Sequence, residues 1–94
     1  MESSLAETRR GKIARMLKVT DMSPSEISSA IGEKVSYVVD DLVHISRSRK
    51  YGFMMVLPAR CLKCGYVFKP EIKVPKRCPR CKSTWISEPR FKLV

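Results

Sequence analysis

Residues 61–81 of this 94-residue chain read CLKCGYVFKPEIKVPKRCPRC. This stretch holds two CxxC pairs, Cys61/Cys64 and Cys78/Cys81, which include every cysteine of the chain. A CxxC turn delivers two sulfur ligands from one side of a metal ion, and a second turn facing it completes a tetrahedral four-thiolate site. The thirteen residues between the pairs are enough for a short hairpin that brings the turns together. The spacing therefore predicts one metal ion bound by all four cysteines.

Zinc and iron both suit four thiolates, and two disulfides are the alternative to a metal. Disulfides are disfavoured because nothing marks the chain as secreted. The segments CLKCGYVF and CPRC resemble the metal-binding turns of rubredoxins, which hold one redox-active iron and carry electrons. This region is instead strongly basic and poor in aromatic side chains, so we expect one structural Zn²⁺ per chain, with a closed coordination shell. Gly65 follows the first turn, whereas Lys82 stands where a second glycine might be expected, so the two halves of the site are not equivalent.

The net charge is +10 at pH 7, and the metal-binding half carries most of it. Residues 1–50 have nine basic and seven acidic side chains, whereas residues 51–94 have ten basic and two acidic ones. Such an excess of positive charge favours a polyanionic partner, and nucleic acid is a better candidate than an anionic membrane surface. The alternative is that the lysines only keep the protein soluble. The chain has no Asn and no Gln, so bidentate pairing of these side chains with adenine is excluded.

Several other classes of protein are disfavoured. The longest apolar run, residues 53–57, is far short of the roughly 18 residues that a membrane-spanning helix needs. With no visible signal peptide, we expect a cytoplasmic protein without membrane association. The chain has one histidine, no nucleophile beside a base and no glycine-rich phosphate loop, so we expect neither an enzyme nor a small-molecule substrate.

The first half of the chain begins with two predicted helices. Residues 5–18, LAETRRGKIARMLK, place apolar side chains at helical spacing, with Ala6, Ile13 and Leu17 on the inner face. Residues 23–26, SPSE, form a capping box, with proline in the first turn of a short helix that ends at Gly32.

A longer helix is predicted from Val35 onward. Its inner face repeats apolar side chains at Val35, Val38, Val39, Leu42 and Ile45. Its outer face is expected to present Ser36, Tyr37, Asp40, Asp41 and His44. The short helix, the turn at Gly32 and the longer helix form a helix-turn-helix, and the first helix completes the three-helix core of a winged helix. A plain three-helix bundle is the alternative.

The C-terminal half predicts a small sheet that receives the metal-binding segment as an insertion. Residues 51–57 have strand-like composition where a wing would begin, and we expect residues 53–57 to pair with residues 91–94. The predicted fold class is therefore α+β: a winged helix-turn-helix of three helices and a small β-sheet, with a four-cysteine rubredoxin-like zinc ribbon at the wing position.

This fold divides the chain into three parts. They are a helix-turn-helix core (residues 1–57), the zinc ribbon inserted in the wing (58–89) and the closing strand of the wing sheet (90–94). Within the ribbon we expect short strands at residues 66–68 and 84–86. Trp85 is expected to cover the metal-binding turns rather than to stack on a nucleic acid base.

The metal-binding segment and its flanks resemble a known family. PARCLKCGYVFK, KRCPRCKS and EPRF, together with RRGKIARMLK and PSEISSAIG, are similar to a group of small archaeal proteins. These are predicted transcription regulators that join a winged helix-turn-helix to a C-terminal rubredoxin-like zinc ribbon. The resemblance covers nearly the whole chain. It implies zinc at the four cysteines and a role in DNA-linked regulation, without a target.

We therefore predict a DNA-binding transcription regulator that contacts the phosphates of double-stranded DNA. The predicted nucleic-acid-binding residues are Lys34, Ser36, Tyr37, Arg47, Arg49, Lys50, Lys63, Lys76, Arg77, Arg80 and Lys82. Asp40 and Asp41 on the longer helix would oppose phosphates. They favour the alternative, a protein–protein interaction module of the transcription or replication apparatus that docks through the acidic helix-turn-helix face.

Overall fold

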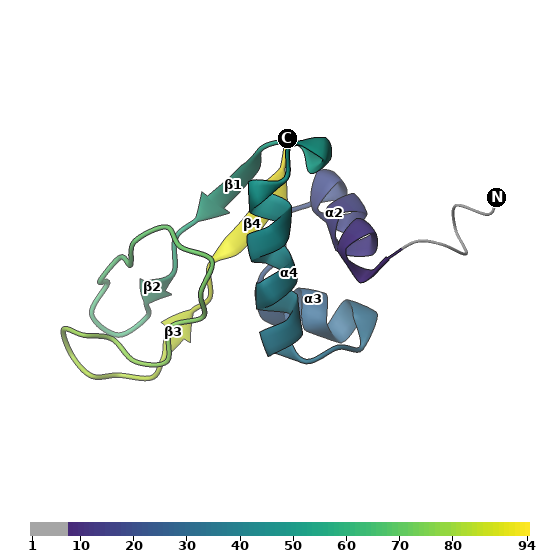
Figure 1. Ribbon diagram of the computed structural model, residues 1–94. Helices are drawn as coiled ribbons and strands as arrows, with labels where there is room; N and C mark the ends of the chain where they lie inside the picture. Colours follow the sequence, from purple (N-terminus) through teal and green to yellow (C-terminus); the bar gives the residue numbers. More distant parts are fainter. Residues whose placement is uncertain (1–7) are drawn as a thin grey trace.

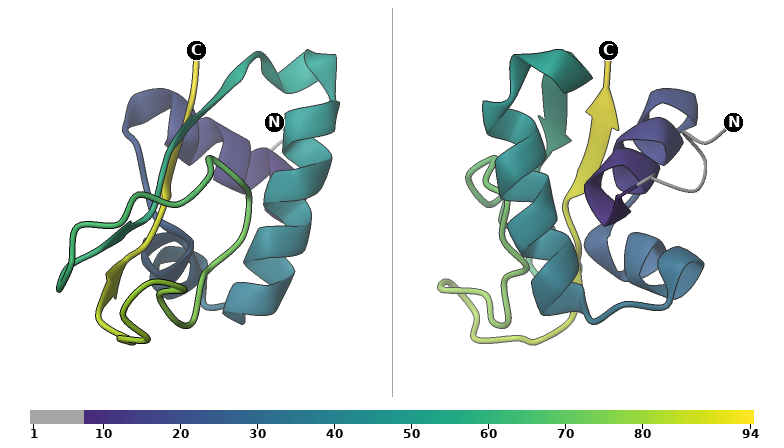
Figure 2. Two further views of the ribbon diagram at one scale, coloured as in Figure 1. Left: turned by 90° about the vertical axis from the view of Figure 1, so that its left-hand side faces the viewer. Right: turned by 45° about the vertical axis from the view of Figure 1, so that its right-hand side comes forward.

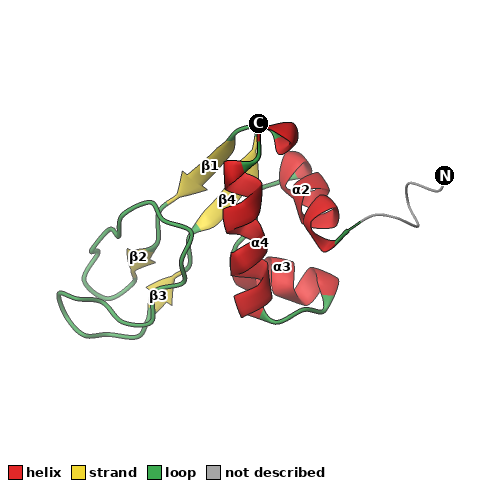
Figure 3. Cartoon of the chain, viewed as in Figure 1, coloured by secondary structure: helices red, strands yellow, loops and turns green. Residues whose placement is uncertain are grey.

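Three helices and four short strands make up residues 8–94, the part of the chain that the computed structural model describes. The helices are α2 (Arg9–Val19), α3 (Pro24–Ile31) and α4 (Val35–Arg47), followed by the 3₁₀ turn η1 (Arg49–Tyr51). The strands are β1 (Met54–Leu57), β2 (Arg60–Cys61), β3 (Ile86–Ser87) and β4 (Arg90–Leu93). The helices group on one side and the loops around β2 and β3 on the other, with β1 and β4 between them (Figures 1 and 3). The α+β class is confirmed. No helix within residues 8–94 is long and apolar enough to cross a membrane.

Helix α2 is capped by Thr8, whose Oγ1 accepts a hydrogen bond from the backbone N–H of Gly11 (3.0 Å). The predicted inner-face residues Ile13 and Leu17 are completely buried, together with Ala14. Helix α2 ends at Val19, one residue beyond the predicted end. The predicted start at residue 5 and the inner-face position of Ala6 lie outside the described residues.

The capping box of α3 is confirmed. The backbone N–H of Glu26 donates to Ser23 Oγ (3.3 Å), and the backbone N–H of Ser23 donates to Glu26 Oε1 (3.0 Å). Pro24 occupies the first turn, where a missing N–H costs nothing. The helix ends at Gly32, whose positive φ of 72° is a conformation that glycine adopts without steric cost.

Helix α4 buries Val38, Leu42 and Ile45 as its apolar pattern predicts. The predicted outer-face position of Asp41 is wrong, because its side chain is only 1% exposed. Asp41 follows Val38 by three residues and precedes Ile45 by four, so it lies on their face of the helix. Arg9 and Arg10 of α2 donate hydrogen bonds to its carboxylate, which satisfies a charge that would otherwise be costly to bury.

Strands β1 and β4 pair antiparallel in the register Met54↔Leu93 and Val56↔Phe91, which confirms the predicted pairing. On its other edge β4 meets Met22, which exchanges two backbone hydrogen bonds with Phe91 (3.0 and 2.9 Å). Phe91 and Leu93 are buried, and β4 runs between α2 and α4 in the right-hand view of Figure 2. The last strand of the chain therefore completes the helical core, which consists of Ile13, Ala14, Leu17, Ile27, Val38, Leu42, Ile45, Phe91 and Leu93.

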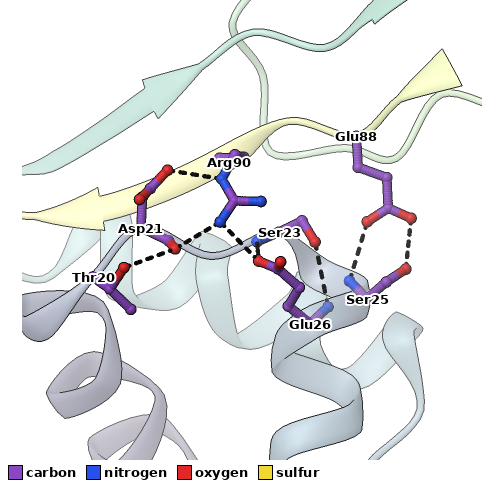
Figure 4. A network of polar contacts seen from close by, with 7 residues as sticks. All are labelled: Thr20, Asp21, Ser23, Ser25, Glu26, Glu88 and Arg90. Carbon is purple, nitrogen blue, oxygen red and sulfur yellow. Dashed lines mark hydrogen bonds and ion pairs between the residues drawn. The ribbon is translucent and has the colours of Figure 1, made fainter.

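A polar network ties the loop before α3 to the approach to β4 (Figure 4). Arg90 donates to Asp21 Oδ2 (2.7 Å) and contacts Glu26 Oε1 (2.9 Å). Ser25 donates from its backbone N–H (3.1 Å) and its hydroxyl (2.5 Å) to the carboxylate of Glu88. The hydrogen bond from Arg90 lowers the pKa of Asp21. These contacts fix the end of the inserted segment against α3.

Candidate metal centre

The first CxxC turn is shaped by three hydrogen bonds around Cys61. The backbone N–H of Cys61 donates to the carbonyl of Tyr66 (2.8 Å), and the N–H of Gly65 donates to the carbonyl of Cys61 (3.0 Å). The N–H of Cys64 points at Cys61 Sγ (3.4 Å). Gly65 has a φ of 82°, which this tight reversal requires.

The second turn repeats this pattern around Cys78. Its N–H donates to the carbonyl of Ser83 (2.9 Å), its carbonyl accepts from Lys82 (2.9 Å), and its Sγ accepts from the N–H of Arg80 (3.4 Å). Lys82 has a φ of 66°, the one positive φ of a non-glycine residue among residues 8–94. The hydrogen bonds thus hold Lys82 in the left-handed backbone conformation that Gly65 adopts without steric cost, so the two turns have similar backbones although the residues at this position differ.

The two turns face each other and bring the four sulfurs together. All four Sγ atoms lie within 4.8 Å of one another, with Cys61–Cys81 and Cys64–Cys78 separations of 3.6 Å. A tetrahedral ion with metal–sulfur bonds of about 2.3 Å would hold its sulfurs about 3.8 Å apart. Cys61 and Cys78 are buried, and Cys64 and Cys81 are partly buried. The donor set and its dimensions fit one four-coordinate metal ion.

The electrostatics of the cysteines also favour a cation. In the thiol form of the site, the backbone N–H of Cys64 lowers the pKa of Cys61 to about 6. The N–H of Tyr66 acts in the same direction on Cys64, but burial and the neighbouring thiols outweigh it and raise the Cys64 pKa to about 11. Four sulfurs this close cannot all ionise without a compensating positive charge, which a divalent ion supplies.

Comparison with known proteins agrees with both halves of this structure. A family model described as "PF0610-like, N-terminal" matches residues 8–56, and a model described as "PF0610 rubredoxin-like zinc beta-ribbon domain" matches residues 58–94. The chain belongs to the PF0610-like family. The solution NMR structure of protein PF0610 from Pyrococcus furiosus, an archaeon, is 46% identical, with a TM-score of 0.77 over 92% of this chain and 88% of that one. No curated protein sequence matches the chain.

The family match confirms the predicted rubredoxin-like ribbon and the relation to archaeal proteins. Inside this PF0610-type ribbon the strands differ from the prediction. Residues 66–68 contribute only an isolated bridge, Val67↔Arg60, and residues 84–86 contribute only Ile86 to β3. The carbonyl of Tyr66 accepts instead from the N–H of Cys61 in the first metal-binding turn, and the N–H of Phe68 donates to the carbonyl of Ala59.

Trp85 was expected over the metal-binding turns of the ribbon, and this prediction is wrong. Its side chain is 65% exposed. The smaller aromatic pair Tyr66 and Phe68 packs edge to face instead, with ring centroids 5.0 Å apart. Strand alternation explains the difference, because Trp85 precedes the half-buried Ile86 and must therefore point to the opposite face.

The predicted nucleic-acid-binding residues fall into two groups on this PF0610-like fold, and all of them are exposed. The first group surrounds α4, with Lys34 at its start, Ser36 and Tyr37 in its first turn, and Arg47, Arg49 and Lys50 at its end. The second group flanks the metal-binding turns and consists of Lys63, Lys76, Arg77, Arg80 and Lys82.

Two structural features near these groups were missed from the sequence. A hollow of about 280 Å³ lies between the end of α4 and β1, and its lining includes Arg47, Arg49, Phe53 and Val56. Arg60, on the short strand β2, adds a further exposed cation to the ribbon. The sequence offered no strand pattern to mark it, because β2 contains only Arg60 and Cys61.

Proposed function

We propose that this protein is a DNA-binding transcription regulator with a winged helix-turn-helix fold. The chain order supports the proposal: α3, the turn at Gly32 and α4 form two helices joined by a tight turn, and β1 and β4 follow as paired strands. The bridge between Met22 and Phe91 adds a third strand position between α2 and α3. The metal-binding ribbon then takes the place of the wing tip.

The single observation that carries the proposal is the burial of Asp41. With its carboxylate held by Arg9 and Arg10, one of the two acids predicted on the outer face of α4 is removed from it. Asp40 is the acidic side chain that remains exposed there. Repulsion from phosphates is therefore reduced, whereas the basic side chains at both ends of α4 stay available for phosphate contacts.

We propose zinc as the metal. The closed four-sulfur shell suits a structural ion, and the zinc named in the matching ribbon model supports this choice. An enzymatic role finds less support, because such a shell leaves no coordination position for a substrate. A redox role finds less support because the matching ribbon model names zinc, which has no redox chemistry. One zinc per chain by elemental analysis of a colourless protein is the expected result. A red protein containing iron would favour the electron carrier.

Fluorescence anisotropy with labelled duplex DNA tests DNA binding directly. The metal-loaded protein is titrated at several salt concentrations with the region upstream of its own gene and with a scrambled duplex. Binding that weakens steeply with salt supports phosphate contact, and preference for the upstream fragment supports regulation. Absence of binding at low salt overturns the proposal.

Matched variants locate the duplex contact. Arg47→Ala with Arg49→Ala should reduce the slope of log K against log salt by roughly 1.8, because each phosphate contact contributes about 0.9. Lys12→Ala on the outer face of α2 is the control and should leave the slope near that of the wild type. Asp40→Asn should strengthen binding if α4 faces the groove.

Docking of α4 on a protein is the second candidate function. Tyr37 is 46% exposed, and the guanidinium of Arg9 lies 5.3 Å from its ring centroid, so a large aromatic side chain is held at the surface. Aromatic residues of this kind are enriched at protein interfaces. Loss of a captured partner on Asp40→Ala or Tyr37→Ala, without a change in DNA affinity, would favour docking.

A further inference from the structure

One face of the ribbon sheet carries a set of exposed side chains that the metal site does not use. The register pairs Arg60 with both Ser87 and Val67, and the N–H of Leu62 donates to the carbonyl of Trp85 (2.9 Å). Side chains directly opposite in antiparallel strands share a face, as do residues two apart. Arg60, Leu62, Val67, Trp85 and Ser87 therefore form one surface, here called the outer ribbon face, and all five are exposed.

This outer ribbon face is unusually apolar for a surface so strongly charged elsewhere. Trp85 is 65% exposed, Val67 56% and Leu62 44%. Tryptophan is normally among the most buried side chains on average, and a contiguous exposed apolar patch marks an interaction site. The alternate residues of the same strands, Cys61 and Ile86, point inward toward the metal site and the ribbon interior. The apolar patch is thus the outward side of a strand pair whose other side is already filled.

A hollow of about 230 Å³ adjoins this face at the Arg60 end. Its lining includes Arg60, Val67 and Ser87 of the outer ribbon face together with Leu57 of β1. Two further charged residues line it, but Glu88 is held by Ser25 and Arg90 by Asp21 and Glu26. Within residues 8–94 no acidic side chain pairs with Arg60. Arg60 is therefore a cation ready for an external anion beside an apolar hollow.

We propose that the outer ribbon face binds single-stranded nucleic acid, with an unpaired base stacked on Trp85 and a neighbouring phosphate on Arg60. The charge of this half indicates the class of ligand. Residues 51–94 hold ten basic and two acidic side chains, and this net positive charge repels a second copy of the chain and attracts a polyanion. The aromatic surface selects the single strand, because a base offers its flat face to a side chain only when it is unpaired. The hollow next to Arg60 receives a second base. This site lies on the ribbon and is independent of whether α4 enters a duplex.

Trp85 is the one tryptophan of the chain, so its intrinsic fluorescence reports contact at this face directly. The metal-loaded full chain is titrated with a dT oligonucleotide and with a matching U oligonucleotide, which separate DNA from RNA as the source of the strand. Saturable quenching of Trp85 is expected with at least one of them. By anisotropy, Trp85→Ala should weaken binding about 5- to 150-fold, whereas Trp85→Phe should retain most of the affinity because it still stacks. Arg60→Ala should reduce the salt slope by about 0.7.

Phe53→Ala provides the matched control, since Phe53 is another exposed aromatic (69%) that lies outside the ribbon face. It should leave single-strand binding unchanged. The proposal is overturned if Trp85→Ala binds the oligonucleotides as well as the wild type does, or if polyglutamate quenches Trp85 equally, which would indicate a general polyanion surface. Duplex binding measured in parallel separates the two proposals. If Trp85→Ala loses single-strand binding but keeps duplex binding, the ribbon site is supported. If it loses single-strand and duplex binding equally, the ribbon is not a separate site and the proposal is overturned.

Discussion

Arg10 of α2 reaches the buried carboxylate of Asp41 in α4, with its Nε 3.1 Å from Oδ1. Arg9, one residue earlier, donates to the same carboxylate through Nε and Nη2. The acid is buried whereas both arginines remain more than a third exposed. The inward-facing carboxylate of Asp41 thus binds two guanidinium groups, and these contacts hold the start of α2 against the middle of α4.

Asp41→Asn should lower the unfolding temperature by about 5–10 °C. The amide keeps the shape but weakens charge-assisted hydrogen bonds, and their exposed arginine partners limit the loss to the lower part of the usual range. Thermal unfolding followed by circular dichroism measures the change. Asp40→Asn is the control on the exposed side of the same helix, and its unfolding temperature should stay within about 3 °C of the wild type. Equal effects of the two variants would mean that Asp41 is not the buried partner.

Lys82→Gly should stabilise the metal-loaded protein by about 1 kcal/mol. A non-glycine residue in the left-handed region loses roughly 1–2 kcal/mol to the contact of Cβ with the backbone, and glycine removes that contact at some entropic cost. Denaturant unfolding of the metal-loaded protein measures the difference. Lys82→Ala is the control, because it removes the charge but retains Cβ, and it should not be stabilised.

Gly65→Ala tests the same idea in the other turn, with the opposite sign. It should destabilise the protein by about 1 kcal/mol through backbone strain, because no atom lies within 4 Å of the added Cβ. A much larger loss would show that the cost arises from a clash or from the metal site itself.

Metal removal should loosen the ribbon while leaving the helices folded. The helical core is built from residues of α2, α3, α4 and β4 and contains none of the four cysteines, although Ile72 of the ribbon packs against it. Chelation followed by amide NMR should broaden the signals of Gly65 and Lys82 or move them to random-coil positions, while those of Leu42 and Phe91 keep their positions. Loss of the helical circular dichroism signal on chelation would instead show one cooperative unit.

The sequence predicted what depends on local pattern. The capping box at Ser23, the Gly32 turn and the apolar stripe through Val38 each follow from short-range chemistry, and the CxxC spacing brought four distant sulfurs together. Asp41 was placed on the outer face because it is charged, although its position three residues after Val38 puts it on the inner face. Its partners Arg9 and Arg10 come from another helix, so local sequence could not reveal them. Trp85 was misplaced for a similar reason, since its face depends on a strand register that composition does not reveal.

Arg90→Met should flatten the dependence of stability on pH in the acidic range. Arg90 lowers the pKa of Asp21 from its ordinary value of 3.8, and the N–H of Ser23 together with Arg90 lowers the pKa of Glu26 from 4.5. The folded state therefore binds fewer protons than the unfolded state, so the stabilisation is complete above these ordinary values and is lost as the pH falls through the lowered ones.

Urea unfolding between pH 6 and pH 2.5 measures the effect. Arg60→Met removes the same charge without breaking an ion pair and serves as the control; because metal release at low pH is common to all three proteins, the difference between the variants isolates Arg90. Parallel curves for Arg90→Met and the wild type would show that Arg90 does not set these two pKa values.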